Sequence, residues 1–278
     1  MQITWGLSGL SPSKKGNIQE LSNKPLKVES GGGRLIVEKE MHGEGWRTQG
    51  AAEKYLQMVD VVAPGRKEIL SVIARIATSM EPEQPRILDI GCGMGIVTDE
   101  ILRYSPKASV VMMDYSEEMV SICNERFKDN PNIQILHHDL NEGLGQCIEG
   151  RFDAVVSCFA IHHVDFENRV KLYKDINSVL KESGVFCNGD LFRGDSPLIH
   201  EWEFDNYICW MMDQLREKLG QQYTFEDLKA KQLENYELMR DKPGTVWDMC
   251  NDLKLAGFRF VDCLFKYQNL AVIAATNR

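Results

Sequence analysis

The hydrophobic positions of this chain follow two periodicities that alternate along the sequence. Short apolar runs, typical of strands buried in a parallel sheet, occupy residues 86–90, 108–113, 133–136, 153–158 and 184–189. Apolar residues at helical spacing occupy residues 66–80, 96–104, 116–128 and 167–181. Strands that alternate with helices predict an α/β domain with a parallel sheet and helices on both faces.

The pattern changes after Asp190. Residues 192–244 have a helical pattern that is unusually aromatic, and we expect them to form a helical cap inserted into the domain. A helix is predicted over 245–256, where Gly257 ends it. Two β-like runs follow, "FRFVDCLF" and "NLAVIAAT", which are close enough in sequence to form an antiparallel hairpin.

The N-terminal part of the chain has a different composition. Residues 1–45 are rich in Ser, Gly, Asn and Lys, and we expect a mobile extension there, with residues 46–278 forming the folded domain. Within that domain, Pro64 predicts a break between a helix over 51–62 and the helix over 66–80.

Composition and charge narrow the class of partner. The 278 residues are 43% hydrophobic, which is enough for the core of one large α/β domain. The formal net charge is −9 and basic residues are not clustered, so no nucleic-acid or anionic-membrane surface is expected. No apolar run is long enough to span a bilayer. We expect a cytoplasmic protein with a small-molecule partner, and a homodimer stays open.

The cysteines indicate a reducing compartment and no metal site. They are scattered singly, without a CxxC pair or a Cys/His cluster at zinc spacing, and we expect reduced core residues. The eight are Cys92, Cys123, Cys147, Cys158, Cys187, Cys209, Cys250 and Cys263.

A glycine-rich segment, "RILDIGCGMGIVTDEIL", joins the first apolar run to a helical pattern. A strand, a glycine turn and a helix bring a nucleotide-like ligand against bare backbone at the carboxyl edge of a sheet. The dinucleotide fingerprint G-x-G-x-x-G would need glycine at Ile96, which disfavours an NAD-dependent oxidoreductase. Asp89 lies just before the glycines, where a carboxylate would repel a pyrophosphate but suit an ammonium or sulfonium group.

Five motifs in order extend this pattern. "ILDIGCGMG", "VVMMDYSEEMV", "HHDL", "FDAVVSCFAIHHV" and "LKESGVF" resemble those of the class I S-adenosylmethionine-dependent methyltransferases of small-molecule type, over about residues 50–278. The resemblance implies a Rossmann-like fold with a mostly parallel seven-stranded sheet and an antiparallel last strand. It also implies S-adenosyl-L-methionine as cofactor and methyl transfer to a small, partly hydrophobic or aromatic acceptor.

Asp114, at the end of the second predicted strand, can accept hydrogen bonds from both hydroxyls of a ribose. The alternative role is a helix N-cap, which Ser116 would serve equally well. The resemblance implies that Asp139 accepts from the adenine amino group and that the Leu140 amide serves a ring nitrogen. A carboxylate that stabilises a turn is the alternative for Asp139.

The other cofactor-binding residues are implied by the resemblance. In this family the cofactor meets a glycine loop, residues that flank the adenine, residues beside its methionine end, and a closing helix. The residues implied for these roles are Asp89, Gly91, Gly93, Gly95, Tyr115, Met119, Cys158, Phe159 and Arg66. Apolar packing would also explain Met119, and an exposed arginine at a helix start would also explain Arg66. Cys158 reads as inert packing and not as a nucleophile.

Methyl transfer from a sulfonium needs alignment and exclusion of water more than it needs a base. If a base acts, His162 and His163 are the candidates, because they follow the fourth strand at the mouth of the expected site. The alternative is that they pack and shape the loop. His137 and His138 are expected to be structural.

The aromatic insertion points to the acceptor. Trp202, Tyr207, Trp210 and Met211 are expected to line an apolar pocket, although part of this set would form the core of the cap. The chain also resembles carboxy-S-adenosylmethionine synthases, which use prephenate and an arginine in the cap, but Arg216 and Arg240 match that arginine poorly. A cofactor-binding regulator without catalysis is the third alternative.

Overall fold

The structure is a computed structural model that describes residues 62–79, 83–145, 148–239 and 241–278. The predicted N-terminal extension, the predicted helix up to residue 61 and Cys147 lie outside the described residues. Among the described helices, none is long and apolar enough to cross a membrane.

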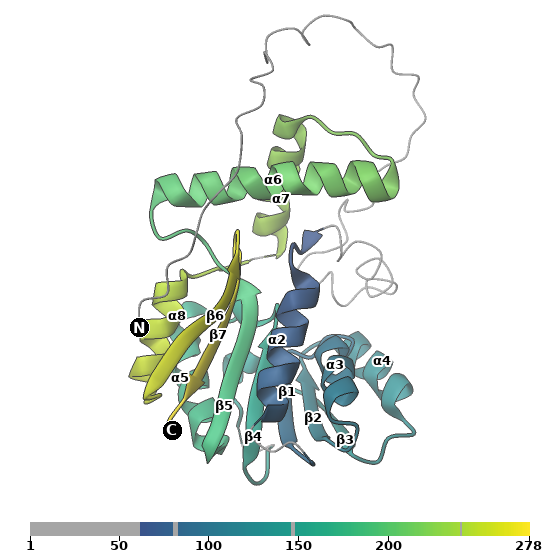
Figure 1. Ribbon diagram of the computed structural model, residues 1–278, viewed down its shortest axis with the longest axis vertical. Coiled ribbons are helices and arrows are strands. Elements are labelled where there is room, and N and C mark those ends of the chain that lie inside the picture. The colour runs from purple at the N-terminus through teal and green to yellow at the C-terminus, as the bar shows by residue number, and fades with distance from the viewer. Residues whose placement is uncertain (1–61, 80–82, 146–147, 240) are drawn as a thin grey trace, which may run out of the picture. The chain divides into compact units, whose positions relative to one another are not determined.

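The core of the chain is one sheet of seven strands in the order β3-β2-β1-β4-β5-β7-β6 (Figure 1). β7 is antiparallel to both β5 and β6, and the other pairs are parallel. The predicted fold class is therefore confirmed. The strands are β1 (Arg86–Ile90), β2 (Ser109–Asp114), β3 (Ile133–His137), β4 (Phe152–Cys158), β5 (Leu180–Leu191), β6 (Phe260–Tyr267) and β7 (Leu270–Thr276).

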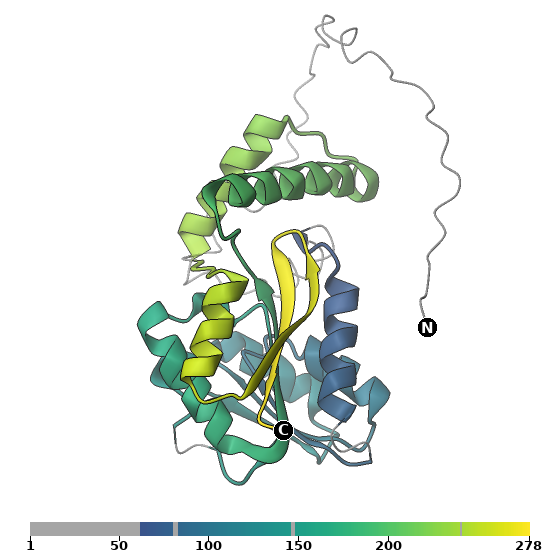
Figure 2. The same cartoon turned by 60° about the vertical axis from the view of Figure 1, so that its left-hand side comes forward.

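Helices cover both faces of the sheet because the strands are apolar on both sides (Figure 2). On one face, α2 (Arg66–Ser79), α3 (Ile96–Tyr104) and α4 (Glu117–Phe127) pack against alternate strand residues such as Ile87. On the other face, α5 (Phe166–Val179) and α8 (Val246–Leu255) pack against the intervening residues, such as Leu88.

The predicted helical insertion consists of α6 (Pro197–Leu219) and α7 (Phe225–Met239). Ser196 caps the start of α6 by accepting a hydrogen bond from the Ile199 amide, and Gly220 ends it in a left-handed conformation. The cap has its own small core, in which the rings of Phe204 and Tyr236 lie 5.7 Å apart.

The cap leaves and rejoins the domain at neighbouring points. The Arg193 amide, just after β5, donates to the Gly244 carbonyl at 3.0 Å, just before α8. Other contacts also join the cap to the domain. Among them, the Tyr207 hydroxyl donates to the Val62 carbonyl at 3.0 Å, and Lys266 pairs with Glu203.

The structure corrects two expectations. The helix predicted to reach residue 181 ends at Val179, because Leu180 already pairs with Phe152 in the sheet. The cysteines are not all core residues: Cys209 on α6 and Cys263 on the edge strand β6 are exposed. A lone cysteine in an apolar run does not reveal which face of a helix or edge strand it occupies.

Candidate active site

The glycine loop lies between β1 and α3. Gly91, Gly93 and Gly95 all have positive φ, at 64°, 51° and 79°. A Cβ added to Gly91 would lie 2.2 Å from the Ala160 Cβ, and one added to Gly95 would lie 2.6 Å from the Phe127 ring. A Cβ added to Gly93 would meet nothing within 4 Å. Gly91 and Gly95 are therefore needed for packing, whereas Gly93 lies on the open side of the loop.

Asp114 ties the glycine loop to the end of β2. Its buried carboxylate accepts from the Gly93 amide at 2.8 Å and from the Ser116 amide at 2.9 Å. Burial raises the pKa of Asp114 above its ordinary value. Ser116 is the N-cap of α4 and accepts from the Met119 amide, so the capping role falls to Ser116. The carboxylate has further lone pairs for hydroxyl donors.

Asp89 is fully buried at the end of β1. Its Oδ2 accepts from the Thr98 hydroxyl at 2.8 Å, whereas its buried Oδ1 has no hydrogen-bond partner among the described residues. Burial raises the pKa of Asp89 to about 7. An unsatisfied buried acceptor of this kind costs about 1–3 kcal/mol. This oxygen is therefore suited to a donor, and best to a cationic one.

The turn after β3 contains the two residues predicted to meet adenine. Asp139 is exposed, and its Oδ1 accepts from the Asn141 amide at 2.9 Å, so it stabilises the short helix η2 (Leu140–Glu142). The alternative role foreseen for Asp139 is thus present, and the adenine contact of Asp139 and Leu140 stays a prediction. Nearby, Tyr115 is half-buried and Met119 is buried against Met94.

At the end of β4, Cys158 is half-buried and Phe159 takes a left-handed conformation with φ of 54°. The Phe159 amide donates to the Gly189 carbonyl at 2.9 Å, which holds this turn against β5. Burial raises the pKa of the Cys158 thiol well above its ordinary value, and the charge of Arg66 opposes that shift. Arg66 at the start of α2 thus lies near the end of β4, and Cys158 stays a neutral thiol.

His162 is buried in the short helix η3 (Ile161–His163), between carboxylates from two distant segments. Its Nδ1 lies 2.5 Å from Asp190 Oδ1 and its Nε2 lies 3.6 Å from Asp241 Oδ1. Burial lowers the pKa of His162, but the charge and hydrogen bond of Asp190 outweigh burial and raise it. For Asp190, the same partner outweighs burial and lowers the pKa.

His163 faces the carboxylate of Asp241, as His162 does. Its Nδ1 lies 3.3 Å from Asp241 Oδ1, and its side chain is 29% exposed. Burial and the charge of His162 hold the pKa of His163 well below its ordinary value. The two predicted histidines thus lie side by side, with ring centroids 4.0 Å apart.

Neither Asp190 nor Asp241 was among the residues predicted for the site. Asp190 could have been found, because it lies near the carboxyl end of a predicted parallel strand, where site residues gather. Asp241 follows α7 in a connection whose sequence has no hydrophobic periodicity or motif.

A buried arginine fixes this cluster. Arg169 on α5 donates to the carbonyls of Val164, His162 and Lys242. The Lys242 amide also donates to the His162 carbonyl at 3.0 Å, and the Lys242 side chain pairs with Asp165. The segment that leaves the cap is therefore held directly against η3.

The predicted acceptor residues divide into two groups. Tyr207 and Met211 are buried and Trp210 stacks on Tyr207, with centroids 6.4 Å apart. Trp202 is 62% exposed, on the solvent side of α6. The structure therefore brings three of the four residues together and leaves Trp202 apart.

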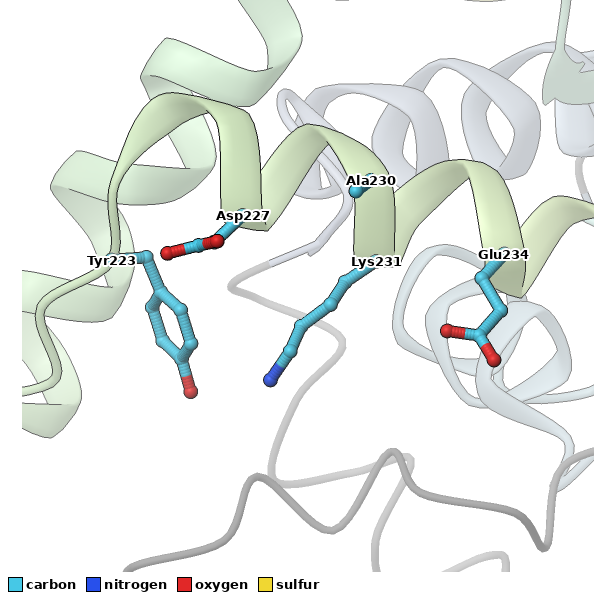
Figure 3. A pocket seen from close by; sticks show the side chains of 5 residues that line it. All are labelled: Tyr223, Asp227, Ala230, Lys231 and Glu234. Carbon is cyan, nitrogen blue, oxygen red and sulfur yellow. The ribbon is translucent and has the colours of Figure 1, made fainter.

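A hollow of about 330 Å³ lies along α7 and is lined by Tyr223, Asp227, Ala230, Lys231 and Glu234. Figure 3 shows the side chains of Tyr223, Lys231 and Glu234 on the same side of the helix. The lining carries charges of both signs and includes none of the predicted site residues.

Comparisons with known proteins agree with the motifs. Residues 87–184 match the family model described as "Methyltransferase domain". The chain is 35% identical to the putative methyltransferase YqeM of Bacillus subtilis over 107 residues, 37% of this chain and 41% of that protein. It is 26% identical to a carboxy-S-adenosyl-L-methionine synthase of Psychromonas ingrahamii over 223 residues, 78% of this chain and 86% of that protein.

Solved methyltransferase structures share the fold. A putative O-methyltransferase from Nostoc punctiforme matches with a TM-score of 0.57 and 16% identity, over 84% of this chain and 62% of that one. Human N-acetylserotonin methyltransferase, in complex with SAM, matches with a TM-score of 0.53 and 17% identity, over 83% of this chain and 57% of that one.

The chain spans less than half the length of the first two curated relatives that it matches, at 41% and 42%. The matched region runs from β1 into β5 and contains the glycine loop, Asp114 and the histidine pair. The sheet order and the antiparallel β7 agree with the fold that the motifs implied. Residues 87–184 of this chain match a methyltransferase domain and lie in a class I methyltransferase fold.

Proposed function

We propose that this chain is an S-adenosylmethionine-dependent methyltransferase that acts on a small, partly hydrophobic or aromatic acceptor. The observation that carries the proposal is the arrangement of two carboxylates and one open glycine at the ends of β1 and β2. Gly93 is open, Asp114 accepts a hydrogen bond from its amide, and the Oδ1 of Asp89 at the end of β1 is buried without a hydrogen-bond partner among the described residues.

The chemistry of this arrangement fits the cofactor. The Asp89 Oδ1, which has no donor in the described part of the chain, would receive the cofactor's ammonium group, and Asp114 would receive the ribose hydroxyls. The absence of a Cβ at Gly93 would let the backbone approach the ligand. When bound, the cofactor supplies a methyl group on a sulfonium, which is electrophilic without further activation.

The domain's own residues would orient the acceptor and exclude water. Tyr207, Trp210 and Met211 would provide the apolar surface, and η3 would provide the polar edge. The general-base role of either histidine, the cytoplasmic location and a homodimer stay predictions.

A second candidate is an enzyme like the carboxy-S-adenosylmethionine synthases, because that relative matches most of both chains. Such an enzyme needs an arginine in the cap for a carboxylate. Arg216 on α6 is exposed and pairs with Asp213 at 2.6 Å, and Arg240 lies outside the described residues. The placement of Arg216 favours methyl transfer.

The first test is calorimetric titration of the whole chain with S-adenosylmethionine, S-adenosylhomocysteine and NADH in parallel. Micromolar binding of the first two and none of NADH supports the proposal. Binding of NADH alone contradicts it.

A second experiment separates the two enzyme candidates. Mass spectrometry after incubation with S-adenosylmethionine and prephenate reports whether the cofactor itself gains mass. A carboxylated cofactor would support the synthase, whereas an unchanged cofactor with methylation in an acceptor screen would support methyl transfer.

A further inference from the structure

His162, His163 and Asp241 form a compact group of metal-ligating side chains between η3 and the segment after α7. One ring nitrogen of each histidine and a carboxylate oxygen all lie within 4.8 Å of one another. In the described part of the chain, this is the one group of at least three such residues with this geometry. The sequence predicted no metal site, since adjacent histidines and a distant aspartate have no ligand spacing.

Two distances in the group match those around a metal ion. The Nε2 of His162 and the Nδ1 of His163 lie 3.6 Å and 3.3 Å from Asp241 Oδ1. Tetrahedral ligands bound at about 2.0–2.1 Å are separated from one another by about 3.3 Å. The three side chains therefore need only small adjustments to share one ion.

Asp241 itself points to a missing partner. Its Oδ1 is buried, and among the described residues it makes no hydrogen bond, although both histidines lie close. A carboxylate oxygen buried without a donor is unfavourable. A cation between Asp241 and the two rings would satisfy it.

His162 is already oriented as a ligand. Its Nδ1 faces Asp190 Oδ1 at 2.5 Å, so that its Nε2 is directed to the other side of the ring, toward Asp241. Metal-binding histidines commonly donate their second ring nitrogen to a carboxylate, which fixes the tautomer and the ring. Arg169 and the Lys242 amide hold the backbone on both sides of the group.

We propose that His162 Nε2, His163 Nδ1 and Asp241 Oδ1 bind one divalent transition-metal ion, with Zn²⁺ the best fit. Two imidazoles and one carboxylate suit Zn²⁺ and its neighbours, whereas Mg²⁺ and Ca²⁺ prefer oxygen ligands. Three protein ligands leave a fourth position open. The partial exposure of His163 gives that position access from outside.

Such an ion would link the cap to the methyltransferase domain, because Asp241 follows α7 and the histidines follow β4. An oxygen, nitrogen or sulfur atom of the acceptor could occupy the open position. This role rests on the proposed function, whereas metal binding itself does not. With the ion bound, Nε2 of His162 is a ligand and cannot serve as a base.

The test is calorimetric titration of the full chain with ZnCl₂, after treatment with a chelator and without S-adenosylmethionine. We expect one ion per chain. His163→Ala and Asp241→Asn should each weaken binding at least about 100-fold, and Asp190→Asn by about 10–100-fold. His200→Ala, on α6 outside the group, is the matched control and should bind as the unaltered chain does.

A spectroscopic measurement on the unaltered chain covers the case in which a variant fails to fold. Co²⁺ in place of Zn²⁺ should give the intense visible absorption of four- or five-coordinate sites, without a thiolate band. Absence of binding, equal binding by His163→Ala and Asp241→Asn, or loss of binding in His200→Ala would overturn the proposal. Because the cofactor is left out, this failure is distinct from failure of methyl transfer.

Discussion

The glycine-loop side and the cap side of the candidate site are built in different ways. On the glycine-loop side, Asp89 and Asp114 lie at the ends of the neighbouring strands β1 and β2, Gly93 lies in the loop after β1, and their hydrogen bonds join the adjacent elements β1, β2 and α3. On the cap side, His162 meets Asp190 from the next strand and Asp241 from beyond the cap. The first depends on local backbone geometry, whereas the second depends on the docking of a distant segment.

This difference separates the effects of mutation. A change at the glycine loop should alter the fold and cofactor binding together, because the same atoms serve both. A change on the cap side should alter acceptor chemistry and leave the cofactor bound. Experiments at five places, the glycine loop, Asp114, Arg169, Asp89 and α6, sharpen or break this comparison, beginning with the largest expected effect.

Alanine at two glycines of the same loop should destabilise the chain to different extents. Gly95→Ala would place a Cβ 2.6 Å from Phe127 and 2.8 Å from Met112 on a left-handed backbone, and we expect a loss of about 2–5 kcal/mol of stability. Gly93→Ala meets no atom, so it should lose only about 1–2 kcal/mol for its left-handed backbone, while weakening S-adenosylhomocysteine binding. Thermal unfolding measures the stability, and calorimetric titration measures the binding of S-adenosylhomocysteine. Equal stability of the two variants would contradict the packing role of Gly95.

Asp114→Ala should weaken S-adenosylhomocysteine binding at least about 100-fold, since it removes the predicted ribose acceptor and releases the Gly93 and Ser116 amides. Calorimetric titration measures the affinity. Asp129→Ala removes an exposed carboxylate after α4 and is the charge control. Unchanged affinity in Asp114→Ala would exclude the ribose role.

Arg169→Met tests the cap side. It removes the donor shared by the carbonyls of Val164, His162 and Lys242, although the His162 carbonyl keeps the Lys242 amide, and we expect a loss of about 3 kcal/mol of stability. Acceptor turnover should fall, whereas cofactor affinity should change less than threefold in the fraction that is folded. Denaturant unfolding measures the stability. Titration at denaturant concentrations below the unfolding transition measures the cofactor affinity of the folded chain. A parallel loss of cofactor binding would show that the two sides are not independent.

Cofactor affinity should depend on pH through Asp89. With a pKa of about 7 without ligand, Asp89 is protonated below neutrality, and an ammonium group needs it ionised. The dissociation constant should therefore fall about tenfold per unit as pH rises from 5 to 7, and level off above. Asp89→Asn should bind weakly with a flat profile.

The stability of the unliganded chain should fall as pH rises, whereas cofactor affinity should rise. The folded pKa of Asp89 is about 7 and the ordinary value is 3.8, so the folded state holds this proton more tightly. Stability contributed by this group is therefore lost as pH rises from about 4 to 7. A stability that rises through this window in the unaltered chain and falls in Asp89→Asn would refute the assignment.

The smallest effect is expected at Trp202. Its ring is 62% exposed, so Trp202→Ala should change stability by less than about 0.5 kcal/mol and leave kcat/KM unchanged. Met211→Ala, at a buried position of the same helix, should lose about 2–4 kcal/mol. A tenfold loss of kcat/KM in Trp202→Ala would show that the acceptor reaches the outer face of α6.

Most of the fold could be predicted because it depends on local periodicity. The apolar runs, the helical patterns and Gly257 place the strands and helices to within a few residues. Within the site, Gly93 and Asp114 were predictable because a strand end and a glycine turn leave them few positions. The exposure of Trp202 was not, because a continuous aromatic pattern does not show which side of a helix meets the cap's core.

Asp241 was beyond prediction for a different reason. Its proximity to His162 depends on the Lys242 amide and on Arg169, two contacts between segments far apart in the sequence. Neither contact leaves a periodic signal. The place of Asp241 in the site is therefore a property of the tertiary structure alone, whereas His162 and His163 could be predicted from the sequence.

The hydrogen bond between Arg193 and Gly244 has a consequence for how such enzymes can be re-engineered. Because the chain enters and leaves the cap at adjacent backbone positions, the intervening residues form a loop whose two ends already meet. A helical segment from another methyltransferase could be joined at these two points without moving β5 or α8. The acceptor preference of the proposed methyltransferase could then be exchanged together with the cap, while the part of the domain proposed to bind the cofactor stays unchanged.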